Sequence, residues 1–95
     1  AQIMELRRGS PTLPSDETLL DLGYDLLEAA LLADAVAIFE HNLGLHPTSA
    51  YSYDGLADAA LAVGDTERAA RHLQTSLRMD PANTYAINKL KRLRR

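Results

Sequence analysis

Two proline turns at a fixed interval constrain the fold of this chain more than any other feature of its sequence. Pro47 and Pro81 lie 34 residues apart. Residues at equal distances before the two prolines match in type: Leu19 with Tyr53, Leu22 with Leu56, Gly23 with Ala57, Leu26 with Ala60, Ala35 with Ala69, Phe39 with Leu73, and Leu43 with Leu77. A period of about 20–50 residues is the signature of stacked repeats, each of which buries its apolar face against its neighbours. The chain is therefore predicted to fold as consecutive copies of one small unit.

Start and stop signals divide each period into two helices. Ser15 is a candidate N-cap, and Asp16 and Glu17 follow it in the first turn, where the helix dipole favours negative charge. Gly64 can end a helix with a positive φ angle, whereas a proline ends the helix that follows. The other predicted caps are Thr48 or Ser49, Asp65 or Thr66, and Asn83, which gives helices over residues 16–29, 33–45, 49–62, 66–79 and 84–93. No stretch alternates with a period of two residues, so no sheet is predicted.

The first pair of helices lacks a glycine between them, but the repeat register still places a turn near residues 30–33. Alternation of small and large side chains predicts how the helices pack, because small residues let two backbones approach and large ones fill the space beside them. The small positions are Gly23, Ala35, Ala57 and Ala69, and the large positions are Leu22, Phe39, Leu56 and Leu73.

This pattern resembles the tetratricopeptide repeat. The residues that carry the resemblance are Leu22, Gly23, Leu26, Ala35, Phe39 and Pro47 in the first repeat, and Leu56, Ala57, Gly64, Ala69, Leu73, Leu77, Asp80, Pro81, Ala82 and Asn83 in the second. Ala60, Asn42 and the missing glycine of the first repeat depart from the family pattern. The resemblance implies an all-α solenoid of antiparallel helix pairs over residues 15–95. Its parts are repeat one (16–47), repeat two (49–81) and a closing helix (83–95). Separately, Gly9, Pro11 and Pro14 predict that residues 1–14 are a linker or chain entry, with room for a short helical turn at 3–6.

A second set of residues within 35–93 carries a looser resemblance: Phe39, Asn42, Pro47, Tyr53, Asp54, Leu56, Gly64, Ser76, Leu77, Pro81, Asn83, Ala86 and Leu90. This stretch is similar to the C-terminal tetratricopeptide segment of bacterial serine hydrolases of the esterase or beta-lactamase type. The domain that holds the nucleophile in those proteins has no counterpart here, so no activity follows from the resemblance. It implies instead that the chain is an appendage of a larger bacterial protein. The compartment stays open: cytoplasmic is favoured, and periplasmic follows if the chain is attached to a secreted hydrolase. A start at Ala1 is compatible both with removal of an initiator and with a piece of a longer protein.

Charge is divided unevenly along the chain. Residues 15–80 carry a net charge of −9, and residues 81–95 carry five basic and no acidic side chains. An acidic body repels phosphate, so nucleic acid is not expected as a partner. The basic end, residues 89–95, is interpreted as a solubilising cap, because terminal repeats need a polar outer face and helix C-termini favour positive charge. No apolar run is long enough to span a membrane, and no membrane partner is expected.

Catalytic and metal-binding motifs are not found. The three histidines, His41, His46 and His72, lack the i, i+4 spacing of a helical zinc site, and the chain has no cysteine. No serine lies in a nucleophile elbow or a Ser-x-x-Lys pair, and the glycines are isolated rather than gathered in a phosphate loop. We therefore predict no catalytic residue, no metal and no cofactor.

A peptide groove is what the resemblance implies as the functional surface. The first helix of each repeat lines the concave face in that family, so the candidate groove residues are Glu17, Leu20, Tyr24, Leu27, Glu28, Tyr51, Asp54, Asp58, Leu61, Tyr85, Asn88 and Arg92. Alternatively, Tyr24 and Tyr51 pack between the repeats. A subclass that grips chaperone C-termini needs Lys and Asn where this chain has Leu20 and Tyr24. The acidic candidates favour a basic or neutral peptide over an acidic one.

Two classes of function remain open, and a third, weaker possibility is a fragment of a serine hydrolase whose catalytic domain is absent here. In the first, the chain is a non-catalytic interaction module, a scaffold that docks onto a protein, a peptide or its own upstream domain. In the second, it is a self-association device, because Leu19, Leu22 and Leu26 form one stripe on the first helix that needs a cover. A second copy in a symmetric homodimer would supply that cover.

Overall fold

The structure is a computed structural model that describes residues 14–94, and those residues form five helices without a strand. The helices are α1 (Asp16–Glu28), α2 (Leu32–Leu45), α3 (Ala50–Ala62), α4 (Thr66–Met79) and α5 (Thr84–Leu93). The all-α prediction is confirmed, and no predicted boundary is displaced by more than one residue. The linker expected at 1–14 and its helical turn at 3–6 lie outside the described residues, apart from Pro14.

Four helices begin at the polar caps that the sequence offered. The side-chain oxygen of Ser15 accepts a hydrogen bond from the backbone N–H of Thr18, as predicted. Of the open alternatives, Ser49 rather than Thr48 caps α3, and Asp65 rather than Thr66 caps α4. Asn83 caps α5. Each cap satisfies a backbone donor at a helix end that has no partner within the helix itself.

The turns after α1 and α3 have the same geometry although their sequences differ. Gly64 has a φ angle of 81°, and Ala30, which lies 34 residues earlier, has a φ angle of 63°. After α1, the N–H groups of Ala30 and Leu31 donate to the carbonyls of Leu27 and Leu26, and Gly64 and Asp65 repeat this pattern after α3. Both ends are therefore Schellman caps. The first uses alanine in a left-handed conformation that costs an L-residue about 1–2 kcal/mol.

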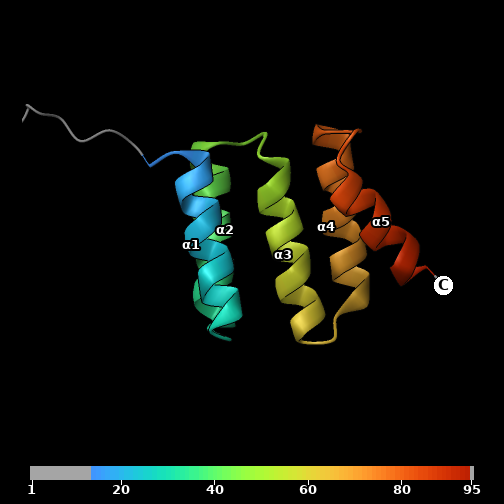
Figure 1. Cartoon of the computed structure of the whole chain (residues 1–95), viewed down its shortest axis with the longest axis horizontal. Helices are drawn as coiled ribbons and strands as arrows, with labels where there is room; N and C mark the ends of the chain where they lie inside the picture. The colour runs from blue at the N-terminus through green and yellow to red at the C-terminus, as the bar shows by residue number, and fades with distance from the viewer. Residues whose placement is uncertain (1–13, 95) are drawn as a thin grey trace, which may run out of the picture.

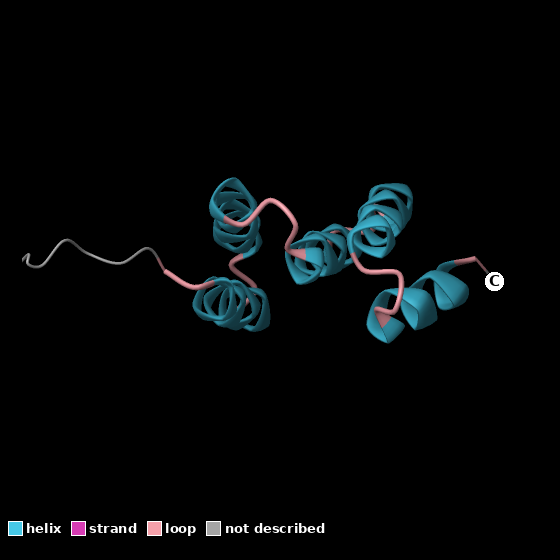
Figure 2. Ribbon diagram, turned by 90° about the horizontal axis from the view of Figure 1, so that it is seen from above, coloured by secondary structure: helices cyan, strands magenta, loops and turns pink. Residues whose placement is uncertain are grey.

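Successive helices run in opposite directions and form a row in chain order (Figure 1). Each helix packs against the next, and α1 also contacts α3. Seen from above, α1 and α5 lie on one side of the row, α2 and α4 on the other, and α3 lies between them (Figure 2). The arrangement leaves an inner face that α1, α3 and α5 share.

The core has two parts, one on each side of α3. The first centres on Phe39 of α2, which is completely buried together with Ala35 and packs against Leu56. The second contains Ala57, Ala60, Ala69, Leu73, Ala86 and Leu90 from α3, α4 and α5. Close approach around Phe39 depends on two glycines: a Cβ atom built on Gly23 would lie 2.5 Å from its ring, and one built on Gly55 would lie 2.3 Å away.

The predicted alternation of small and large residues is confirmed at seven of its eight positions and wrong at Leu22. The side chain of Leu22 is 43% exposed, whereas the matched residue Leu56 is 7% exposed. The reason is the position of each helix in the row, since α2 packs on Leu56 while no described helix precedes α1. The proposed apolar stripe on α1 also needs correction, because Leu19 is buried and Leu26 packs against the core.

A buried polar cluster joins the first three helices and explains the unusual Asn42. Its side-chain amide donates to Asp16 over 2.7 Å and to Ser52 over 2.6 Å. The hydroxyl of Ser49 also donates to Asp16, over 2.6 Å. Asn42 is completely buried, so its side chain ties the start of α1 to the start of α3 through hydrogen bonds.

Candidate functional site

A depression of about 430 Å³ lies on the inner face between α1 and α3. It is lined by Tyr24, Asp25, Leu27, Glu28, Asp58 and Ala62, and we call it the inner groove. Three of its six lining residues are acidic and two, Tyr24 and Leu27, offer large apolar surfaces. Such a mixture suits an occupant with both a positive charge and an apolar part.

Of the twelve predicted groove residues, Tyr24, Leu27, Glu28 and Asp58 line the inner groove. Tyr85 reaches it by a hydrogen bond to Asp58. Glu17, Tyr51, Asn88 and Arg92 are exposed but lie outside the lining, and Leu20, which packs against the core, does too. The side chain of Leu61 likewise packs against the core. The site therefore uses the centre of the predicted surface rather than its whole length.

Tyr24 lines the inner groove and also packs within the first predicted repeat, which differs from the packing between repeats given as the alternative. Its ring packs edge-on against Phe39, with 5.2 Å between the ring centroids, so the residue belongs to the contact between α1 and α2. Tyr24 is nevertheless 36% exposed, because it also lines the inner groove. Burial raises the pKa of Tyr24, and the negative charge of Asp58 raises it further. Its hydroxyl is therefore neutral and available as a donor beside an acidic side chain. Tyr51, by contrast, is 51% exposed and does not pack between the repeats.

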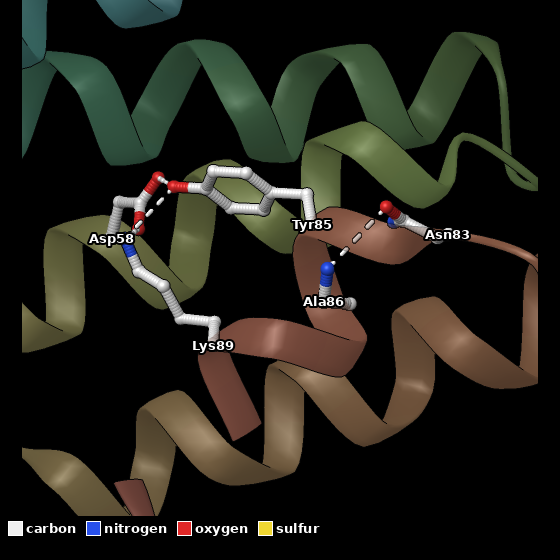
Figure 3. A network of polar contacts seen from close by, with 5 residues as sticks. All are labelled: Asp58, Asn83, Tyr85, Ala86 and Lys89. Carbon is white, nitrogen blue, oxygen red and sulfur yellow. Dashed lines mark hydrogen bonds and ion pairs between the residues drawn. The ribbon is translucent and has the colours of Figure 1, made fainter. Parts of the chain in front are cut away.

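Asp58 is the centre of a polar network that joins α3 to α5 (Figure 3). One carboxylate oxygen accepts a hydrogen bond of 2.5 Å from the hydroxyl of Tyr85, and the other lies 3.2 Å from the ammonium of Lys89. The same ammonium donates to the Tyr85 hydroxyl over 3.0 Å and lies 4.8 Å from the centre of the Tyr85 ring. One cation thus contacts a carboxylate, a phenol oxygen and an aromatic ring together.

The electrostatics of this network favour the charged form of Lys89. Burial lowers the pKa of Lys89, but hydrogen bonds to Tyr85 and Asp58 outweigh it, so the pKa lies above the ordinary lysine value. Burial and the hydrogen bond to Asp58 raise the pKa of Tyr85. At neutral pH the network therefore contains an ammonium, a neutral phenol and the Asp58 side chain.

Lys89 is the residue of this site that sequence reasoning missed. It was interpreted as one of the solvated cations of residues 89–95, whereas the structure directs its side chain back onto α3. The signal that could have found it is the spacing of Tyr85 and Lys89, which are four residues apart and therefore share one face of a helix. A lysine on the same face as a predicted groove tyrosine was a candidate for the groove.

Asp54 was expected in the groove, and that expectation is wrong because its side chain is completely buried. Its Oδ2 atom accepts a hydrogen bond of 2.7 Å from the amide of Asn83, which also donates to Ser76. Burial raises the pKa of Asp54, and the hydrogen bonds from Asn83 and Ser76 oppose the rise. Its Oδ1 atom has no hydrogen-bond partner among the described residues. Asp54 therefore anchors the start of α5 instead of contacting a ligand.

A second and larger depression, of about 590 Å³, lies among α2, α3 and α4. Its lining is mainly apolar, and its charged residues are Glu40, Asp65 and Arg68 with His72 beside them. Asp65 and Arg68 form an ion pair at 3.3 Å. Burial lowers the pKa of His72, and the nearby Arg68 and Arg71 lower it further. Two acidic residues against one basic residue make this depression less strongly acidic than the inner groove, whose lining has three acidic residues and no basic one.

Comparisons with known proteins do not identify the candidate site. The sequence matches no protein-family model and no curated protein. Within residues 14–94, no three His, Cys, Asp or Glu side chains are placed to hold a metal ion. None of the helices described by the structure is long and apolar enough to cross a membrane.

Proposed function

We propose that this chain is a tetratricopeptide-type interaction module that binds a basic or neutral peptide segment in the inner groove. The observation that carries the proposal is the groove itself: Asp25, Glu28 and Asp58 surround a depression whose apolar surfaces are Tyr24 and Leu27. Acidic side chains around aromatic surface attract cationic partners and repel anionic ones. The role is non-catalytic, and the partner is a protein or the segment of a larger bacterial protein to which the chain belongs.

Residues 34 positions apart support the repeat assignment, because several of them have the same structural role. Ala30 and Gly64 both take left-handed conformations, and Ser49 and Asn83 both cap the helix that follows. Phe39 and its counterpart Leu73 are both completely buried. Such equivalence is expected of stacked units with one common architecture.

A nuclear magnetic resonance titration of the ¹⁵N-labelled chain tests the proposed function. Two octapeptide pools serve as probes, both with apolar positions and one with only Lys and Arg, the other with only Asp and Glu, as charged residues. The basic pool is expected to shift the amide signals of Tyr24, Leu27, Glu28 and Asp58, and the acidic pool is not. Equal shifts with both pools, or shifts confined to α2 and α4, would refute the groove assignment.

Matched charge reversals on α1 sharpen that test. Glu28 lines the inner groove, whereas Asp21 is exposed on the same helix outside the lining. Glu28→Lys is expected to weaken binding of the basic pool, and Asp21→Lys, which makes the same change in net charge, is expected to have little effect. If both variants weaken binding equally, general electrostatic attraction rather than the groove accounts for it.

Self-association, the alternative function, has less support. Two leucines of its proposed stripe, Leu19 and Leu26, are covered within the chain. Leu22 remains 43% exposed, and one exposed leucine is an ordinary feature of a protein surface. The interaction module therefore remains the preferred proposal.

A further inference from the structure

We infer that Asp58 and Tyr85 form a subsite for the cationic side chain of a bound peptide, and that Lys89 occupies this subsite in the free protein as an internal competitor. This inference rests on the proposed function, and it adds two features: the chemical group that is recognised, and a contact within the chain that limits binding.

The first argument is that a cation is already seated in the subsite. The ammonium of Lys89 lies 3.2 Å from Asp58, 3.0 Å from the Tyr85 hydroxyl and 4.8 Å from the centre of the Tyr85 ring. A carboxylate and an aromatic face around one position are the groups with which proteins recognise lysine, arginine and other organic cations. The contacts of Lys89 thus show what chemistry the subsite accepts.

The second argument is that the subsite is continuous with the inner groove. Asp58 belongs to both: it binds Lys89 and Tyr85 on one side and lines the depression with Tyr24 on the other. Asp25 and Glu28 lie in the same lining. Together with Asp58 they outnumber the single positive charge of Lys89, so the region keeps an excess of negative charge. A peptide in the groove can therefore direct a Lys or Arg side chain toward Asp58.

The third argument is that Lys89 can leave without disturbing the fold. Its side chain is 23% exposed, and its polar contacts are to Asp58 and Tyr85. A lysine side chain is long and flexible, and its ammonium is strongly hydrated, so it can turn toward solvent when another cation takes its place. The aliphatic residues that hold α5 to the core, Ala86 and Leu90, do not depend on it.

The size of the competition follows from the usual strength of such pairs. An ion pair near the protein surface contributes up to about 1 kcal/mol, which corresponds to a factor of about five in an equilibrium constant. Removing Lys89 is therefore expected to raise the affinity for a cationic ligand up to about fivefold. Asp58→Asn removes the carboxylate charge from the subsite and is expected to reduce the affinity below that of the unaltered chain.

The experiment uses two small probes, N-acetyl-arginine amide and N-acetyl-citrulline amide, which have similar shapes but differ in charge. Each is titrated into the chain, into Lys89→Met and into Lys91→Met, and binding is followed by nuclear magnetic resonance. Lys91 is exposed on the same helix, so its replacement makes the same change in net charge outside the subsite. Because Lys89 lies close to the Tyr85 ring, its ε-methylene signal is expected to carry a ring-current shift, and loss of that shift would report its displacement directly.

The arginine probe is expected to bind and the citrulline probe to bind much less. Lys89→Met should tighten arginine binding up to about fivefold, and Lys91→Met should change it little. In the unaltered chain, the Lys89 signal should move toward its position in a free peptide as the probe binds.

Equal binding of the two probes would overturn cation recognition. Equal effects of the two lysine variants would overturn the internal competition. If the basic octapeptide pool still binds in the groove under either outcome, the proposed function stands and only this inference fails. If neither octapeptide pool binds, the proposed function itself fails.

Discussion

Replacing Phe39 with alanine removes the side chain on which α1, α2 and α3 converge. Phe39 is completely buried, its ring packs edge-on against Tyr24, and glycines face it from α1 and α3. Truncation of a buried phenylalanine costs about 3–5 kcal/mol. We expect the upper half of that range here, because Gly23 and Gly55 have no side chains that could collapse into the cavity.

Gly55→Ala tests the same packing more specifically, because the sign of its effect on the free energy of unfolding should depend on whether Phe39 is present. A Cβ atom at position 55 would lie 2.3 Å from the Phe39 ring. Overpacking of this kind costs about 1–3 kcal/mol, which exceeds the gain of about 1 kcal/mol in helix propensity on replacing glycine by alanine. Gly55→Ala should therefore destabilise the chain when Phe39 is present and stabilise it by about 1 kcal/mol when Phe39 has been replaced by alanine.

Urea unfolding followed by circular dichroism measures all four members of this cycle. Gly44→Ala is the matched control, because a Cβ atom at this helical glycine meets nothing within 4 Å. It should stabilise both backgrounds by a similar amount. The whole chain is expected to have about 5–15 kcal/mol of stability, so an osmolyte such as trimethylamine oxide can be added equally to every sample if Phe39→Ala is partly unfolded.

Two results would refute the reasoning. A loss below about 1 kcal/mol on Phe39→Ala is typical of surface positions and would mean that Phe39 is not in the core. Stabilisation by Gly55→Ala in both backgrounds would mean that α3 does not approach the Phe39 ring. If the Cβ atom at position 55 meets the Phe39 ring, the effect of Gly55→Ala on the free energy of unfolding must differ in sign between the two backgrounds.

Other substitutions test the turns, the buried carboxyl group and the assembly. Because Ala30 has a positive φ angle, Ala30→Gly should raise the free energy of unfolding by about 1 kcal/mol, and Gly64→Ala should lower it by about as much; an increase with both would contradict the shared turn geometry. Burial raises the pKa of Asp54 above its ordinary value of 3.8, so the folded state favours the protonated form. Stability should therefore fall as the pH rises from 3.8 through that raised pKa. Asp54→Asn should lack this loss. From pH 3.5 to pH 7, the urea midpoint of the variant should therefore rise relative to that of the unaltered chain. If the two midpoints change by the same amount, the pKa of Asp54 is not raised. Sedimentation equilibrium at several hundred micromolar tests the predicted homodimer: any dimer formed through the surface of α1 should dissociate on Leu22→Glu, and one that survives this change uses another surface.

The sequence alone determined the local structure of this chain. Ser15 and Asn83 cap helices where their side chains can reach backbone donors within three residues, and Gly64 ends α3 with a positive φ angle. These features depend on interactions between near neighbours in the chain, so they can be predicted without knowing how the helices pack. The periodic pattern also predicted that Phe39 and Leu73 are buried, since both occupy the same position in the predicted repeat, and both are completely buried.

Tertiary structure decided which helix faces are covered, and this determined the candidate site. Leu22 and Leu56 have the same register, yet only Leu56 is buried, because α2 packs on it. Asp54 and Asp58 are four residues apart on α3, but Asn83 and Ser76 enclose Asp54 while Asp58 faces the inner groove. Lys89 carries the same charge as Lys91 and differs from it because α5 places its side chain over Asp58. The physical reason is that burial and charge pairing depend on residues from other helices, whose positions follow from the packing of the whole row and not from local sequence.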